Sequence, residues 1–188
     1  MREVYEIMKK VLILHGWGGS DYPHWQAQLA QQLIEANYEV SFPNLPNRDF
    51  PKLNEWLEFL DKHMKDFDPD IVICHSLANI LWFHYVLNYE VKEIEKLMLV
   101  APVSPDCKIE EIKTFFPYLA PKDLRAKDKI MVCGDNDPYI TIDEAYILHN
   151  ILGIGLKVLK NAGHINSESG FGKLDCAFDW INGCKENN

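Results

Sequence analysis

Three residues of this chain, Ser76, Asp137 and His164, have the types needed to turn a hydroxyl group into a nucleophile. A serine hydroxyl reacts poorly until an imidazole accepts its proton, and the imidazole needs a carboxylate that fixes its tautomer and stabilises its cation. We therefore predict that Ser76 attacks a carbonyl carbon, that His164 moves the proton and that Asp137 orients His164.

The residues around Ser76 predict a nucleophile elbow, which is a sharp turn between a strand and a helix. Residues 71–74 form a continuous apolar run, which is typical of a strand covered on both faces, and residues 77–89 predict a buried helix. The elbow requires small side chains two positions before and after the serine, where this chain has Cys74 and Ala78 instead of glycine. The alternative interpretation is that Ser76 only caps the helix.

Asp137 and His164 each lie in a loop after a later predicted strand. Asp135 competes with Asp137 as the acid. We prefer Asp137 because it lies further beyond the strand and precedes Pro138, which favours an extended backbone, and we expect Asp135 to form the turn. The order serine, acid, histidine is that of α/β-hydrolases. The alternative for His164 is a loop histidine that binds only backbone groups.

The glycine-rich segment after the first predicted strand, residues 15–21, is expected to help stabilise an oxyanion. Such stabilisation commonly uses backbone amides, and we predict those of Trp17 and Leu77. The alternative is a dinucleotide-binding loop. It is disfavoured because Asp21 occupies the position of the third glycine and no acidic residue ends the second strand.

Substrate contacts are expected from residues in or near these loops, namely His15, Gly16, Trp25 and Tyr139. A minority of the following aromatic residues is expected to line an acyl pocket: Trp17, Tyr22, Trp25, Phe115, Phe116 and Tyr139. Cys74 is an alternative nucleophile, but a residue two positions before the turn is expected to point into the core.

Alternating strands and helices must position these loops, and such alternation predicts an α/β fold with a mainly parallel sheet. The predicted strands span residues 11–14, 39–42, 71–74, 97–100, 130–133 and 156–159. The predicted helices span residues 24–36, 52–65, 77–89, 143–152 and 174–182, with 109–116 a weaker candidate. We expect a three-layer α/β/α sandwich of about six strands, in which the loops after the strands share one edge of the sheet.

Length and composition limit the function classes. The 188 residues suit one domain, which we expect to span residues 1–188. A formal net charge of −9 without a basic stripe argues against a nucleic-acid partner. No apolar run is long enough for membrane insertion, and the charged residues 1–10 lack a secretion signal, so we expect a cytoplasmic protein.

The five cysteines are an odd number at wide spacing without a C-x-x-C pair. This spacing predicts neither a disulfide framework nor a zinc site. We expect no metal and no cofactor, and the sequence makes no prediction of the oligomeric state.

Three segments carry a resemblance to a known family: His15-Gly16-Trp17-Gly18-Gly19-Ser20 with His24-Trp25, Cys74-His75-Ser76-Leu77-Ala78, and Gly163-His164-Ile165-Asn166-Ser167-Glu168-Ser169-Gly170-Phe171-Gly172. The chain resembles the retinoblastoma-binding-protein-nine-like or YdeN family of small serine hydrolases, members of the α/β-hydrolase superfamily. The resemblance implies a compact domain without a lid, with Ser76, Asp137 and His164 as nucleophile, acid and base. The chain departs from the family at Cys74, where these proteins usually have glycine.

The leading hypothesis is a metal-independent serine hydrolase that cleaves a small carboxylic ester, thioester or amide through an acyl-enzyme. Its partner is then a small-molecule or peptide acyl substrate. The alternative is a protein-interaction module on a hydrolase scaffold with weak or no catalysis, because a fold does not fix a function. A distance of about 2.6–3.2 Å from His164 to both Ser76 and Asp137 favours the enzyme.

Overall fold

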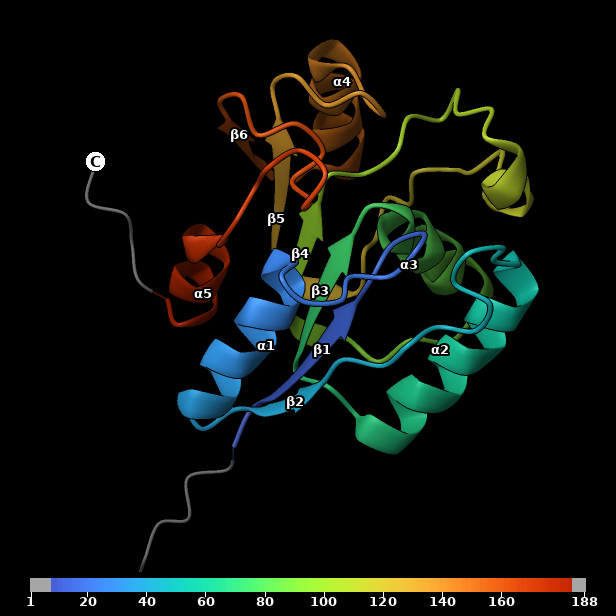
Figure 1. Ribbon diagram of the computed structural model, residues 1–188. Helices are drawn as coiled ribbons and strands as arrows, with labels where there is room; N and C mark the ends of the chain where they lie inside the picture. The colour runs from blue at the N-terminus through green and yellow to red at the C-terminus, as the bar shows by residue number, and fades with distance from the viewer. Residues whose placement is uncertain (1–7, 184–188) are drawn as a thin grey trace, which may run out of the picture.

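Six parallel strands form the central sheet of the computed structural model, which describes residues 8–183 (Figure 1). They are β1 (Lys10–Leu14), β2 (Glu39–Ser41), β3 (Ile71–His75), β4 (Ile94–Val100), β5 (Ala126–Gly134) and β6 (Gly155–Leu159). Their order across the sheet is β2-β1-β3-β4-β5-β6, and every neighbouring pair is parallel. The predicted fold class is confirmed. The ends of the expected domain, residues 1–7 and 184–188 with Cys184, lie outside the described residues.

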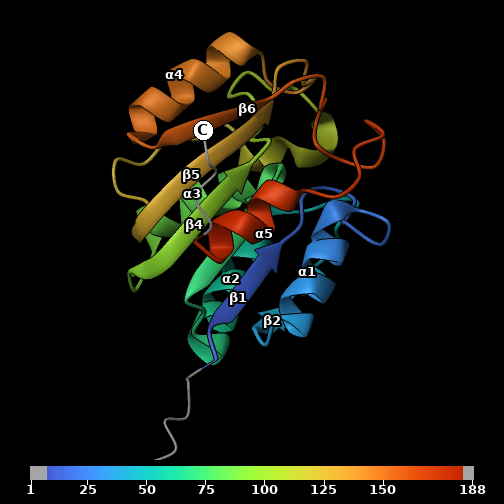
Figure 2. The same cartoon turned by 90° about the vertical axis from the view of Figure 1, so that its left-hand side faces the viewer.

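Helices cover both faces of the sheet, as Figure 1 shows and the rotated view of Figure 2 repeats. One face carries α1 (Trp25–Glu35) and α5 (Asp175–Ile181). The other carries α2 (Leu53–Phe67), α3 (Leu77–Asn88) and α4 (Ile142–Leu152). The sheet therefore lies between two helical layers, each with its own apolar core.

The continuous apolar sequence of β3 follows from this sandwich. Successive side chains of a strand point to opposite faces. Ile71 and Ile73 pack in the core beneath α1 and α5, whereas Val72 and Cys74 pack in the core beneath α2 and α3. Because neither face of β3 meets water, no polar residue interrupts the run.

Two strands begin earlier than the apolar runs predict. β4 starts at Ile94 instead of residue 97, and β5 starts at Ala126 instead of residue 130. After the buried residues Ile94 and Ala126, the next residues of both strands are polar and partly or fully exposed. Hydrogen bonding to the neighbouring strand therefore defines these early parts of the strands, and an apolar run does not. The weak helix candidate at 109–116 is a 3₁₀ helix, η1 (Glu110–Phe115), which ends just before Phe116-Pro117.

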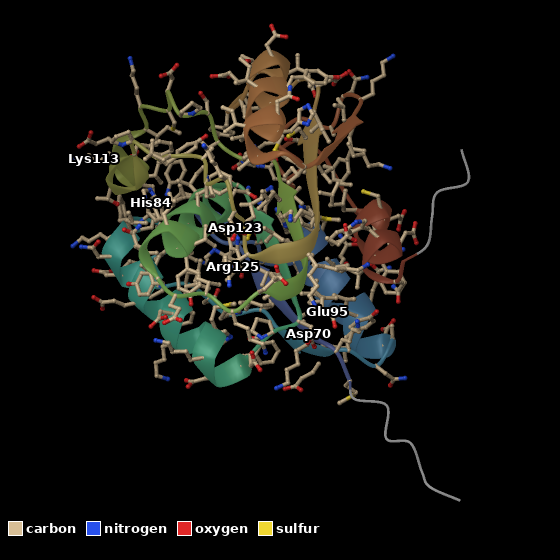
Figure 3. All side chains as sticks on the ribbon, turned by 180° about the vertical axis from the view of Figure 1, so that it is seen from behind. Asp70, His84, Glu95, Lys113, Asp123 and Arg125 are labelled. Atoms are coloured by element: carbon tan, nitrogen blue, oxygen red, sulfur yellow. The ribbon has the colours of Figure 1, made fainter. Side chains whose placement is uncertain are left out.

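The two ends of the sheet differ in character. At the amino ends of the strands, Asp70 and Glu95 lie side by side (Figure 3), and the Glu95 amide donates to the Asp70 carbonyl at 2.8 Å. At the carboxyl ends, the loops after β1, β3, β5 and β6 converge, as predicted for a binding edge. In the described part of the chain, no helix has the length and apolar character needed to cross a membrane.

Candidate active site

Ser76 lies at the turn between β3 and α3 in an unusual backbone conformation. Its φ and ψ angles are 56° and −124°, a region that costs a residue other than glycine about 1–3 kcal/mol. The Ser76 amide donates to the Val100 carbonyl at 2.9 Å. The Asn79 side chain donates to the carbonyls of both Ser76 and Val100 at 2.8 Å. The predicted strand-to-helix turn is therefore present, and these hydrogen bonds hold its strained conformation.

Close packing surrounds this turn. A Cβ atom at Gly16 would lie 2.6 Å from the Cβ atom of Ser76, so the glycine-rich loop reaches the serine only because it lacks a side chain there. Cys74 and Ala78 are fully buried. Burial raises the pKa of the Cys74 thiol, and a thiol without access to solvent cannot meet a substrate. The alternative of a Cys74 nucleophile is therefore wrong.

The side chains of Ser76, His164 and Asp137 form one hydrogen-bonded row. The Ser76 hydroxyl donates to Nε2 of His164 at 2.8 Å. Nδ1 of His164 donates to the Asp137 carboxylate, at 2.8 Å to Oδ2 and 3.0 Å to Oδ1. Because an ionised carboxylate only accepts hydrogen bonds, Nδ1 carries the proton and Nε2 is free to accept one. The Ser76 side chain makes no capping hydrogen bond to α3, so the interpretation of Ser76 as a simple cap is wrong.

The loop after β5 places Asp137, and not Asp135, beside His164. The Asp137 side chain is fully buried against the imidazole and also accepts from the Tyr139 amide at 2.8 Å. Asp135 instead accepts a hydrogen bond from the Asn161 amide at 2.7 Å. Asp135 therefore ties the loop after β5 to the loop that carries His164, and only Asp137 is placed to orient the imidazole.

Three residues without a predicted role hold the backbone around His164. The His75 ring donates from Nε2 to the His164 carbonyl at 3.0 Å, and burial keeps the pKa of His75 well below its usual value. The Ser169 hydroxyl accepts from the His164 amide at 3.0 Å. The Asn136 side chain accepts from the Gly163 amide at 2.7 Å. His75 directly precedes Ser76 in the chain, and Asn136 directly precedes Asp137. This adjacency is the one sequence signal that could have indicated a role for these two residues.

Three residues expected to contact substrate instead shape the loops behind the site. Trp25 is 1% exposed, and its indole donates to the Ile165 carbonyl at 2.8 Å. His15 is equally buried: Nδ1 donates to the Gly16 carbonyl at 2.7 Å, and Nε2 accepts from the Leu45 amide at 2.8 Å. Gly16 packs against the serine turn. None of the three lines the cavity at the site, so their expected substrate contacts are corrected to structural ones.

A cavity of about 540 Å³ opens beside Ser76. Trp17, Leu77 and Tyr139 line it, whereas the other aromatic residues considered for a pocket do not. Within residues 8–183, no hydrogen bond uses the backbone amide of Trp17 or Leu77. The same part of the chain holds no group of three or more His, Cys, Asp or Glu side chains arranged to bind a metal.

His24, on the wall of this cavity, makes stability depend on pH. Its Nδ1 caps α1 by accepting from the Gln26 amide at 3.2 Å. Burial, and then the charges of His164 and His15, lower the pKa of His24 to about 4. The unfolded chain binds a proton here near pH 6.5, so it holds more protons than the folded protein between pH 6.5 and 4. The stabilisation is therefore present above pH 6.5 and is lost as the pH falls through this window.

We expect the substitution His24→Asn to remove part of this pH dependence. Asparagine keeps a side-chain oxygen that can cap α1, but it does not titrate. The measurement is the free energy of unfolding in urea at several pH values from about 7 to 4. Over that range the wild-type protein should lose about 3 kcal/mol more than the variant. Equal losses in the two proteins would contradict a neutral, buried His24.

Comparison with known proteins identifies the family of this chain. Residues 11–182 match the family model for serine hydrolases. The chain is 22% identical over 177 residues to YdeN of Bacillus subtilis (strain 168), which is named as a hydrolase; the alignment covers 91% of this chain and 93% of YdeN. The crystal structure of the ydeN gene product has a TM-score of 0.83 at 19% identity, covering 94% of this chain and 98% of that one.

Two further solved structures share the fold. A YdeN-like protein of Pectobacterium atrosepticum has a TM-score of 0.71 at 22% identity, covering 92% of this chain and 89% of the other. The esterase domain of a Rhodothermus marinus protein has a TM-score of 0.61 at 12% identity, covering 96% and 87%. These structures establish the α/β-hydrolase fold, and the family match spans nearly all of the described residues. The chain belongs to the serine hydrolase family.

Proposed function

We propose that this protein cleaves a small carboxylic ester, thioester or amide through an acyl-enzyme on Ser76. The observation that carries the proposal is the row Ser76, His164, Asp137, with 2.8 Å between Oγ and Nε2 and 2.8 Å between Nδ1 and the carboxylate. Both distances lie in the range that proton transfer requires. A protein-interaction module has no need for this alignment, so the geometry favours catalysis over that alternative.

Each residue of the row has one task in the proposed reaction. Ser76 Oγ attacks the carbonyl carbon while His164 Nε2 takes its proton, and Asp137 stabilises the resulting imidazolium. The amides of Trp17 and Leu77 donate to the oxyanion. His164 then gives the proton to the leaving group, and the carbonyl re-forms as the acyl-enzyme. Water, activated by the same imidazole, attacks the acyl-enzyme, and the breaking bond returns Ser76 Oγ with a proton from His164.

Two observations support a small substrate and an ester bond. The cavity of about 540 Å³ lies in the range of small-molecule sites. A structural neighbour, the Rhodothermus marinus domain, is named as an esterase. We propose a small-molecule or peptide acyl substrate, with the acyl carbonyl placed at the bottom of the cavity beside Ser76.

The proposal is tested by treating the purified protein with an alkyl fluorophosphonate and locating the adduct by mass spectrometry. The phosphorus traps an activated serine and mimics the tetrahedral intermediate. We expect a single adduct on Ser76, formed by the wild-type protein and not by Ser76→Ala. His164→Ala should slow labelling by about 10³-fold or more, because the proton acceptor is lost. Equal labelling of wild type and His164→Ala, or an adduct elsewhere, would contradict the proposal.

A further inference from the structure

The mouth of the cavity carries unbalanced negative charge. Asp49, Glu111 and Glu168 line it, and none of them forms an ion pair within residues 8–183. A fourth acid on the lining, Asp21, is paired with Arg48 at 2.7 Å. Among residues 8–183, no lysine or arginine side chain lines the cavity. A cleft lined by charges of one sign concentrates its field on whatever enters, so this mouth attracts cations and repels anions.

These acids come from separate segments that the fold holds in place. Asp49 belongs to the loop after β2, Glu111 to η1, and Glu168 to the loop that follows His164. The helix η1 is fixed to α3, because His84 Nε2 donates to the Phe115 carbonyl at 2.9 Å. Figure 3 shows His84 on α3 close to Lys113 of η1. The fold therefore holds the three acids in place around the cavity, and the negative field that they produce is a fixed property of the site.

The acids do not form a metal site. No group of three or more acidic, histidine or cysteine side chains in the described chain is arranged to hold a metal ion. The carboxylates lie around a space of about 540 Å³ and do not converge on one point. Such an arrangement fits an organic group whose positive charge is spread over several atoms. A bare divalent ion needs six or more oxygen ligands at about 2–2.6 Å, which separated side chains do not offer.

Aromatic rings stand among these acids on the same lining. Phe50 is 71% exposed at the mouth, and the Trp17 indole is fixed by donating to the Asp49 carbonyl at 2.8 Å. Tyr139 lies with its ring centre 4.5 Å from that of His164. Faces of such rings attract organic cations, and they also cover the apolar part of an amphipathic molecule. Ring faces and free carboxylates together are the combination that recognises ammonium groups.

A buried hydroxyl on the same wall has no partner. Ser20 lies on the lining and is 4% exposed, and its Oγ atom makes no hydrogen bond in the described structure. A buried polar group without a partner costs about 1–3 kcal/mol. The oxygen atom itself has almost no exposed surface in the open cavity, so a ligand there does not reach it. The preference for a charged group therefore rests on the acids and the aromatic rings of the lining.

We propose that the substrate carries an organic cation, such as a primary or quaternary ammonium group, attached near the carbonyl that Ser76 attacks. The proposal rests on the hydrolase function proposed above and adds its substrate class. Neutral esters are poorer substrates, and esters or thioesters with carboxylate or phosphate groups are the poorest, since the unpaired acids at the mouth repel them.

Three fluorophosphonates that differ only at the end of one alkyl chain test this proposal. The chain ends in trimethylammonium, in the isosteric tert-butyl group, or in carboxylate. We expect Ser76 to react with the cationic probe about tenfold faster than with the neutral one, and with the anionic probe about tenfold slower. These ratios should shrink in high salt, because exposed charges are screened. Adduct formation on Ser76 at the same rate for all three probes would overturn the proposal.

Paired substitutions assign the selectivity to the mouth. The variant Asp49→Asn/Glu168→Gln should lower the cation-to-neutral rate ratio about threefold or more. The control is Glu58→Gln, an exposed residue of α2 that does not line the cavity. It changes the net charge in the same direction and should leave the ratio unchanged. An unchanged ratio in Asp49→Asn/Glu168→Gln would contradict the assignment.

The two proposals fail in different ways. If none of the three probes labels Ser76 in a folded protein, the hydrolase function fails and the substrate class fails with it. If all three label Ser76 equally and labelling depends on His164, the hydrolase function stands and only the preference for a cation is overturned.

Discussion

Replacement of Ser76 by alanine is expected to lower kcat for an activated aryl ester by about 10⁴-fold or more. Alanine removes the hydroxyl that lies 2.8 Å from His164 Nε2, so no acyl-enzyme can form on this residue. Whatever hydrolysis remains comes from the oxyanion amides and from binding, which act on a water molecule. The measurement is steady-state turnover of the purified variant, with circular dichroism to show that it is folded. The substitution is not expected to disturb the turn, because alanine and serine both carry a Cβ atom and tolerate its backbone conformation equally.

Ser76 and His164 are also expected to act together in catalysis and not independently. If Ser76 and His164 act in one proton transfer, the double variant Ser76→Ala/His164→Ala should be about as slow as Ser76→Ala alone. Independent contributions would instead multiply. The matched control is Asp135→Asn, two residues before Asp137 in the same loop, which bonds to Asn161 and makes no contact with the imidazole. It should keep kcat within about threefold. A double variant much slower than either single one would contradict a shared mechanism.

The sheet and its functional edge could be predicted because buried parallel strands leave a local pattern. Residues 71–74 are uninterrupted apolar residues since both faces of β3 are covered. Once the strands are known to be parallel, the loops after them must meet at one edge. The position of Ser76, Asp137 and His164 at that edge therefore follows from their place in the sequence, before any side-chain contact is known.

The environment of other residues in the same loops could not be predicted locally. His15 and Trp25 stand beside the glycine-rich segment as a substrate-binding residue would. Besides the adjacent Gly16 carbonyl that His15 binds, their partners are backbone groups 30 and 140 residues away, at Leu45 and Ile165. Because they bind these distant groups, His15 and Trp25 are buried in the core. No residue close to either of them in the sequence indicates this burial. Packing between distant segments decides which side chains face the cavity.

Gly134 is a second feature that only the folded structure explains. Among the loop glycines it looks like an ordinary turn residue, next to Asp135 and Asn136. In the fold it is the last residue of β5, and it packs against the loop after β6. A Cβ atom at Gly134 would lie 2.1 Å from the carbonyl oxygen of Gly163. That oxygen belongs to the backbone directly before His164, so it cannot move aside without moving the imidazole.

We therefore expect Gly134→Ala to destabilise the protein by about 4 kcal/mol, at the upper end of overpacking effects. Any fraction that folds should have lost most of its turnover, because the His164 ring is displaced from Ser76, and a shift of about 1 Å can cost about 10²-fold. Urea denaturation gives the first quantity, and kcat of the folded fraction gives the second. The control is Gly155→Ala in the neighbouring strand, where an added Cβ atom has open space around it; its stability should stay within about 0.5 kcal/mol. If Gly134→Ala were as stable and as active as Gly155→Ala, the contact between the end of β5 and the loop after β6 would not be what sets the distance from His164 to Ser76.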